Sequence, residues 1–257
     1  MKDRVPAVAA AALLWLCACS VKEPRELCPC IVEVDLSAFS ERAHRLSVDL
    51  GGLHLERDFQ DGDSLLLVLR RPRLGLVPLT VWAGGEKMQL RGRTLTVGAL
   101  GGCDSVFVEN VVLDTDGEIC RVRPIPRKQF ANVWLQLIPE EEDPPGISYR
   151  IRSDCNGIIL DSSKPASGPL ELPLDSEGPR FLFRLPRQSE DAALVLESLL
   201  PDGSVQSYPL GNWILEAGYD WNARDLDDIA VGMDLYDGSF TVSVLPWSEG
   251  KNITETI

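Results

Sequence analysis

Histidine is almost absent from this sequence, which contains only His44 and His54. Catalysis of the Ser-His-Asp kind requires a histidine held between a nucleophile and a carboxylate. Neither histidine has a nucleophile motif nearby, and no GxSxG, HExxH, Walker or GxGxxG sequence occurs in the chain. Both histidines are therefore interpreted as surface residues. The sequence predicts neither an enzyme, nor a metal site, nor a cofactor site.

The chain also lacks an apolar run near its start that is long enough to cross a membrane. The run at residues 5–16 (VPAVAAAALLWL) is too short to span about 30 Å of hydrocarbon as a helix, and the positive residues Lys2 and Arg4 precede it. It is typical of a signal peptide. The following LCAC resembles the bacterial lipobox, so we expect cleavage after residue 18 and acylation of Cys19, for example with palmitate. The alternative is an ordinary secretory signal that leaves Cys19 as a plain thiol.

A basic charge excess is missing as well. The whole chain has a formal net charge of −14. Residues 1–18 carry a net charge of +1, so the mature chain is near −15. This acidity argues against nucleic acid as a partner and against electrostatic adhesion to anionic lipid. An acyl anchor would then have to hold the protein at a membrane.

Cysteine is more abundant, with seven residues in the chain. Cys17 leaves with the signal peptide and Cys19 takes the lipid. Cys28-Pro-Cys30 is similar to half of a redox or metal motif, but the second half is missing and zinc is not expected. Five cysteines remain as disulfide candidates, an odd number that cannot all pair within one chain: Cys28, Cys30, Cys103, Cys120 and Cys155. A bridge between Cys103 and Cys120 is one option, and the pairing stays open.

Short apolar runs separated by turn residues dominate the rest of the chain. Glycine-containing turns divide runs rich in Leu and Val, and one helical turn is expected at 37–45. The final hairpin, residues 230–236 and 239–245 around Asp237-Gly238, is the clearest strand pair. The pattern predicts an all-β protein with two β-sandwiches in tandem. The RPIPR segment at 123–127 sets the boundary, which gives these parts: signal peptide 1–18, tether 19–27, sandwiches 28–125 and 126–257.

Acidic loops and tryptophans offer the remaining candidate sites. The loop 114–118 and the run 225–228 contain several carboxylates, but neither has the full ligand set of a calcium loop. Tryptophans could form a sugar-stacking platform if they were exposed and clustered. Trp213 and Trp221 lie near glycine-containing loops and are candidates for exposure. The others in the mature chain are expected in the core: Trp82, Trp134 and Trp247.

Several motifs, taken in order, resemble the FimB/Mfa-type fimbrial anchor lipoproteins of Bacteroidales. The lipobox is followed by Cys28-Pro-Cys30, which leads straight into an apolar strand. The segment 79–85 (LTVWAGG) is similar to a strand of that family ending in a Trp-Ala-Gly-Gly turn. Segments 130–137 (FANVWLQL) and 149–157 are similar to the opening strands of its second domain, and the turns at 201–203 and 237–238 suit its closing strands.

The resemblance implies two transthyretin-like, immunoglobulin-like β-sandwiches on a lipid anchor in the cell outer membrane. Such proteins seat a fimbrium, or limit its length, by binding fimbrillin subunits. An open sheet edge offers unpaired N–H and C=O groups to a partner strand, so strand addition is the expected mode of binding. Two alternatives stay open. One is a polymerising fimbrillin or tip subunit trimmed after an arginine (Arg25, Arg42 or Arg45), and the other is a surface glycan-binding lipoprotein.

Overall fold

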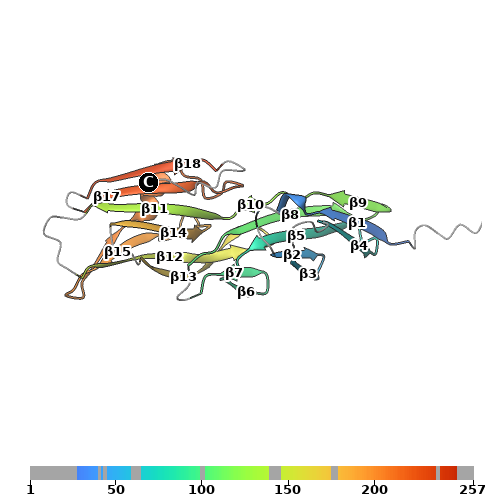
Figure 1. Cartoon of the computed structure of the whole chain (residues 1–257), viewed down its shortest axis with the longest axis horizontal. Coiled ribbons are helices and arrows are strands. Elements are labelled where there is room, and N and C mark those ends of the chain that lie inside the picture. The colour runs from blue at the N-terminus through green and yellow to red at the C-terminus, as the bar shows by residue number, and fades with distance from the viewer. Residues whose placement is uncertain are drawn as a thin grey trace, which may run out of the picture.

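The structure is a computed structural model that describes residues 28–39, 42, 45–58, 65–98, 102–138, 146–174, 179–235 and 238–247. Several sequence predictions fall outside these residues, namely the signal peptide, the lipidated Cys19, the tether and His44. Within the described ranges, no helix is long and apolar enough to cross a membrane. The predicted all-β class is confirmed, with strands throughout the described chain (Figure 1).

Two sheets form the first β-sandwich. A three-stranded sheet has the order β4-β1-β9, and a five-stranded sheet has the order β10-β8-β5-β2-β3. The strands of the small sheet are β1 (Cys30–Asp35), β4 (Leu66–Arg71) and β9 (Ile119–Val122). Those of the large sheet are β2 (Arg45–Leu50), β3 (Leu53–Asp58), β5 (Leu76–Gly84), β8 (Val106–Asp114) and β10 (Arg127–Lys128). Of the helical turn expected at 37–45, the described residues form a 3-10 turn η2 (Ser37–Phe39), and residues 40, 41, 43 and 44 lie outside the described chain.

Two further sheets form the second β-sandwich, which lies end to end with the first along the long axis (Figure 1). The four-stranded sheet has the order β14-β11-β17-β18 and contains β11 (Phe130–Ile138), β14 (Arg180–Pro186), β17 (Asp228–Asp234) and β18 (Phe240–Leu245). The predicted final hairpin is confirmed as the antiparallel pair β17 and β18. The facing sheet contains β12 (Ser148–Ile159), β13 (Lys164–Leu174), β15 (Val195–Leu199) and β16 (Val205–Tyr208), and α2 (Leu210–Glu216) follows it.

Alternating apolar residues build the core of each sandwich, as the period of two in a strand requires. In β5, Val77, Leu79 and Val81 are buried, and in β11 Val133 and Leu135 are buried. Burial of such side chains contributes about 1.5–3 kcal/mol each. The residues between them point to the other face of each sheet, where Thr80 is also buried and Trp134 is half-buried.

A hairpin from the first half of the chain reaches across to the second sandwich. β6 (Gln89–Arg91) and β7 (Thr94–Thr96) form this hairpin, and β7 pairs with the end of β12. Gly157 makes the pairing close, because a Cβ at this position would lie 2.0 Å from the carbonyl oxygen of Leu95. Strands from both halves of the sequence therefore share one sheet.

Ion pairs fix the junction between the sandwiches. The Lys128 side chain is fully buried, and its Nζ lies 2.5 Å from Oδ1 of Asp228. Arg127 bridges Glu109 at 3.3 Å and Asp225 at 2.9 Å. Glu109 belongs to the first sandwich and Asp225 to the second. The ion pairs of β10 therefore hold the two sandwiches together in addition to the chain itself.

Candidate functional site

The cysteine candidates do not form a disulfide in the structure. All five are free thiols, with Cys28 and Cys120 half-buried and the other three buried. Cys103 precedes the nine-residue β8 and Cys120 follows it, so a strand of about 30 Å separates them and they do not lie side by side. Cys30 and Cys120 instead lie on the neighbouring strands β1 and β9. Which cysteines pair, if any do, stays a prediction.

The tryptophan expectations are partly wrong. Trp213 and Trp221 are buried, because α2 packs Trp213 against Phe240 at a ring distance of 4.2 Å and Trp221 packs against Tyr219. Trp134 lies on the outward side of β11 and is half-buried, so its expected place in the core is also wrong. No tryptophan of the described chain is exposed. The structure therefore shows no exposed tryptophan platform in this part of the molecule.

The acidic candidates have structural partners instead of a metal geometry. Among the described residues, no group of three or more His, Cys, Asp or Glu side chains is placed to hold a metal ion. Asp225 and Asp228 pair with Arg127 and Lys128 at the junction. The remaining histidine in the described chain, His54, stacks on Trp82 with 5.4 Å between the ring centres.

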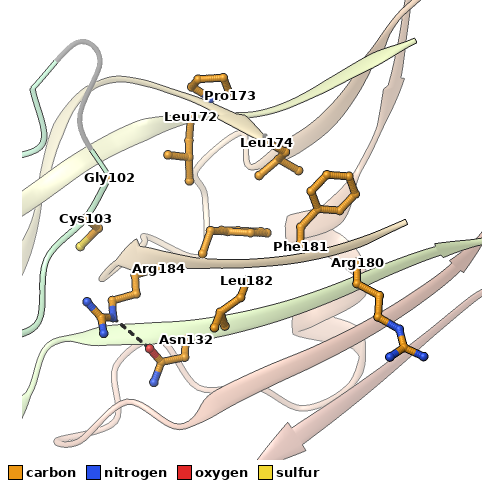
Figure 2. A pocket seen from close by; sticks show the side chains of 11 residues that line it. Gly102, Cys103, Asn132, Leu172, Pro173, Leu174, Arg180, Phe181, Leu182 and Arg184 are labelled. Atoms are coloured by element: carbon orange, nitrogen blue, oxygen red, sulfur yellow. Dashed lines mark hydrogen bonds between the residues drawn. The ribbon is translucent and has the colours of Figure 1, made fainter. Parts of the chain in front are cut away.

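A groove lies between β13 and β14, where the two sheets of the second sandwich each end. It has a volume of about 500 Å³ and is lined from β13 by residues 172–174, from β14 by residues 180–184, and by Gly102, Cys103 and Asn132. Figure 2 shows Leu172 and Leu174 facing Phe181 across the groove. The groove floor is apolar, and its walls are two strands that do not pair with each other.

The backbone of β14 presents hydrogen-bonding groups to this groove. Leu137 N–H donates to the carbonyl of Pro179, and Arg187 N–H donates to the carbonyl of Gln129, so odd-numbered residues of β14 bond to β11. In an antiparallel ladder the alternate residues direct both N–H and C=O to the other side. Arg180, Leu182 and Arg184 therefore turn their backbone groups toward the free edge of the sheet.

The facing strand β13 is less suited to pairing. It contains Pro165, Pro169 and Pro173, each of which lacks an N–H donor. Proline is tolerated in a strand where its nitrogen points away from the ladder. Because the other side of β13 pairs with β12, the missing donors weaken its free edge. β14 is thus the strand at which another strand could add.

Side chains along β14 alternate between groove and surface. Phe181 and Phe183 are buried, whereas Leu182 is 67% exposed. Arg184 Nε donates to Asn132 Oδ1 at 3.1 Å (Figure 2), and one of its terminal nitrogens lies 3.9 Å from Asp104. Arg180 is exposed and extends away from Arg184 (Figure 2). The rim of the groove is consequently basic in a strongly acidic chain.

Cys103 lies at one end of this groove but is not a reactive thiol. Burial raises the pKa of Cys103 to about 12, and the nearby Arg184 opposes this only in part. The thiolate is the nucleophilic form of cysteine, so a thiol with this pKa stays protonated at neutral pH. The groove therefore suits binding by backbone and apolar contacts, without covalent chemistry.

The sequence carries one local signal for this site. Residues 180–186 (RFLFRLP) alternate charged or exposed positions with buried aromatic ones. That pattern identifies a strand, but the missing neighbour on one side of it is a property of the sheet order. No spacing along the chain shows which strand is an edge.

No protein-family model and no curated protein matches this sequence. Several solved structures share its fold, among them the following three. A proposed polysaccharide-binding protein from Bacteroides thetaiotaomicron has a TM-score of 0.62 at 13% identity, covering 86% of this chain and 99% of its own. A proposed adhesin from the same species has a TM-score of 0.56 at 12% identity, covering 84% and 96%.

The fimbrial anchor protein Mfa2 from Porphyromonas gingivalis is the third, with a TM-score of 0.55 at 14% identity, covering 86% of this chain and 98% of its own. At such identities the likeness establishes the fold. The resemblance to fimbrial anchor proteins that the motifs indicated is confirmed at that level.

Proposed function

We propose that this chain is an outer-membrane lipoprotein that anchors a fimbrium, or limits its length, by binding a fimbrial subunit at the free edge of β14. The observation that carries the proposal is the pairing-competent edge of Arg180, Leu182 and Arg184 over an apolar groove. Strand addition needs both features, since the backbone supplies affinity and the pockets select alternate side chains.

The shared fold supports this assignment. One of the three proteins of the same fold is a fimbrial anchor and another is a proposed adhesin, and none of the three is described as an enzyme. The site itself holds no activated nucleophile, because burial keeps the Cys103 thiol protonated.

Membrane attachment in this proposal comes from the lipid on Cys19. The LCAC sequence at 16–19 supports it, and Cys19 lies outside the described residues. Several acyl chains together give stable anchoring, at about 0.8 kcal/mol for each buried methylene. Replacing Cys19 with alanine should release the protein from the membrane fraction of the producing cells. Retention of the variant in that fraction would contradict the lipid anchor.

The binding edge is tested with a proline that removes one donor. Leu182→Pro deletes an N–H that points to the free edge and leaves the β11–β14 ladder intact. Leu182→Asn is the matched control, because it changes the same exposed side chain but keeps the N–H. Each tagged variant is expressed in a strain that lacks the native gene, and the proteins that purify with it are identified.

We expect fimbrial subunits to purify with the wild type and with Leu182→Asn, but not with Leu182→Pro. Circular dichroism should show the same melting temperature for all three chains. Normal recovery of subunits with a folded Leu182→Pro chain would contradict the β14 site. N-terminal sequencing of the mature protein separates an anchor, which keeps an acylated Cys19, from a subunit trimmed beyond it.

A further inference from the structure

Exposed leucines gather at the end of the first sandwich where the chain enters the fold. Leu74 and Leu76 are 62% and 74% exposed, in and after the loop between β4 and β5. Val112 on β8 is 63% exposed and Ile119 on β9 is 48% exposed. We call these four residues, with the loop 70–76, the apolar tip.

Hydrogen bonds show that these segments meet at one end of the molecule. Thr115 N–H donates to the carbonyl of Gly75 at 2.8 Å, and Leu74 N–H donates to the Thr115 hydroxyl at 3.2 Å. Ile31 N–H donates to the carbonyl of Glu118 at 2.8 Å. β1 therefore begins beside the tip, at the right-hand end of the fold in Figure 1.

The charges at the tip are balanced, unlike those of the chain as a whole. Arg70, Arg71 and Arg73 lie in the loop, and three acidic residues lie in and beside the neighbouring turn: Asp114, Asp116 and Glu118. The net charge here is near zero, compared with −14 for the whole chain. The repulsion between an acidic protein and lipid phosphates is therefore weak at this end.

Two of these arginines have unused donors. Nε of Arg71, and Nε and Nη2 of Arg73, are shielded from solvent without a hydrogen-bond partner in the described part of the chain. A buried donor without an acceptor costs about 1–3 kcal/mol. Phosphate oxygens are strong acceptors for guanidinium groups, so these donors would gain an acceptor if the half-buried side chains of Arg71 and Arg73 turned outward to meet lipid phosphates.

The length of the tether brings a lipid surface within reach. Cys28 lies nine positions after Cys19, which limits the span to about 30 Å when fully extended. A flexible chain of that length has a typical end-to-end distance of roughly 15–18 Å. A lipid on Cys19 would hold the apolar tip close to the bilayer at all times, where even weak contacts form readily.

We propose that the apolar tip rests on a phospholipid bilayer, with Leu74 and Leu76 in the boundary between headgroups and acyl chains and with Arg71 and Arg73 donating to lipid phosphates. This inference rests on the proposed lipid anchor. It adds that the protein stands on the membrane in one orientation, with the β14 edge in the sandwich farther from the lipid.

The test uses the chain from residue 19 with Cys19→Ala, which keeps every described strand and carries no lipid. Binding to sucrose-loaded vesicles of phosphatidylethanolamine and phosphatidylcholine is measured by sedimentation at millimolar lipid. Leu74→Asn/Leu76→Asn should lower the partition coefficient at least ten-fold, because two leucines leave the boundary. Arg73→Gln should lower it about five-fold.

The control is Leu90→Asn/Val205→Asn, which replaces two apolar residues, 45% and 50% exposed, away from the tip. It should bind as the parent chain does. A parent chain that does not sediment with vesicles, or a tip variant that binds like the control, would overturn the proposal. Dimerisation of the parent chain without vesicles, lost in the tip variant, would assign the tip to a second copy and also overturn it.

The vesicle experiment on the apolar tip can fail independently of the Cys19→Ala experiment on the lipid anchor. If Cys19→Ala releases the protein from cells and the unlipidated chain ignores vesicles, the lipid anchor stands and the membrane contact of the tip is wrong. If the tip binds vesicles and Cys19→Ala stays with the cell membranes, the combined variant Cys19→Ala/Leu74→Asn/Leu76→Asn separates the two: its release assigns the retention to the tip, and its continued retention contradicts the lipid anchor.

Discussion

Breaking the buried ion pair at the junction should destabilise the protein more than any surface change. Lys128 Nζ contacts Asp228 Oδ1 at 2.5 Å and donates to the carbonyl of Leu226 at 3.0 Å. The rings of Phe130 and Trp247 lie 4.8 and 4.9 Å from the ammonium group. Burial lowers the pKa of Lys128, and Asp228 opposes that effect. The ammonium group thus depends on a few fixed partners.

The two single variants should differ in cost. Removing one partner of a buried pair costs about 3–5 kcal/mol, because it leaves the other charge uncompensated. After Lys128→Met, Asp228 still accepts from the backbone N–H of Asn132 at 2.8 Å and from its side chain at 3.0 Å, so we expect about 3 kcal/mol. After Asp228→Asn, Lys128 loses its paired carboxylate, its direct acceptors are all neutral, and Asp225 and Asp227 act on it only at longer range, so we expect about 4–5 kcal/mol.

The stability of Asp228→Asn should depend on pH through the buried Lys128. The folded state of Asp228→Asn should lose the Lys128 proton at a lower pH than the unfolded state does, since burial lowers the folded-state pKa. The folded state then binds fewer protons, so the stability of this variant should rise with pH up to the unfolded-state value near 10.4. Lys128→Met should not show this rise.

Calorimetry of the chain from residue 19 with Cys19→Ala measures the loss. For a protein of this size, 1 kcal/mol lowers the melting temperature by about 2–4 °C, so Lys128→Met should melt about 6–12 °C lower. The exposed Lys87→Met is the control and should change it little. The double variant Lys128→Met/Asp228→Asn should lose less than the sum of the two single losses. A drop below about 2 °C for Lys128→Met would refute the reasoning.

Three further outcomes follow from other sites. Gly157→Ala should cost about 2–4 kcal/mol in chemical unfolding, because its Cβ would meet a β7 carbonyl at 2.0 Å. Gly117→Ala is the control and should stay within about 0.5 kcal/mol, because its Cβ would make only an ordinary contact of 3.8 Å with the Ile119 carbonyl oxygen. Cys103 should resist iodoacetamide at pH 8 in the folded protein, while half-buried Cys28 reacts, as mass spectrometry would show; equal rates would contradict its raised pKa. Burial opposes ionisation of Glu197, but hydrogen bonds from Arg150 and Arg152 outweigh burial and lower the pKa of Glu197. The stability advantage of the wild type over Glu197→Gln should therefore be complete above about pH 4.3 and vanish as the pH falls through the folded-state pKa. A constant difference across that range would count against the ion pairs.

Local patterns in the sequence were sufficient for the strands. The alternation in β11 and the Asp-Gly turn between β17 and β18 predict these elements within a residue or two. α2 was missed because it is short: Leu210, Trp213 and Ile214 have helical spacing, but seven residues after a proline are fewer than the window over which a helical period is recognised. Trp213 and Trp221 were misplaced for a related reason, since glycine nearby indicates a turn but not what covers it.

What the sequence alone determined is the chemistry that the molecule lacks and the class of fold that it adopts. Scarce histidine, the short apolar run before Cys19 and the period of two are properties of neighbouring residues, so they are readable along the chain. Only the tertiary structure decided which strands lie at edges. Sheet order leaves the backbone of β14 free on one side and places the prolines of β13 at the facing edge. It also brings the segment 70–76 beside the start of β1. Sheet order is set by contacts between segments far apart in the sequence, which no local pattern records.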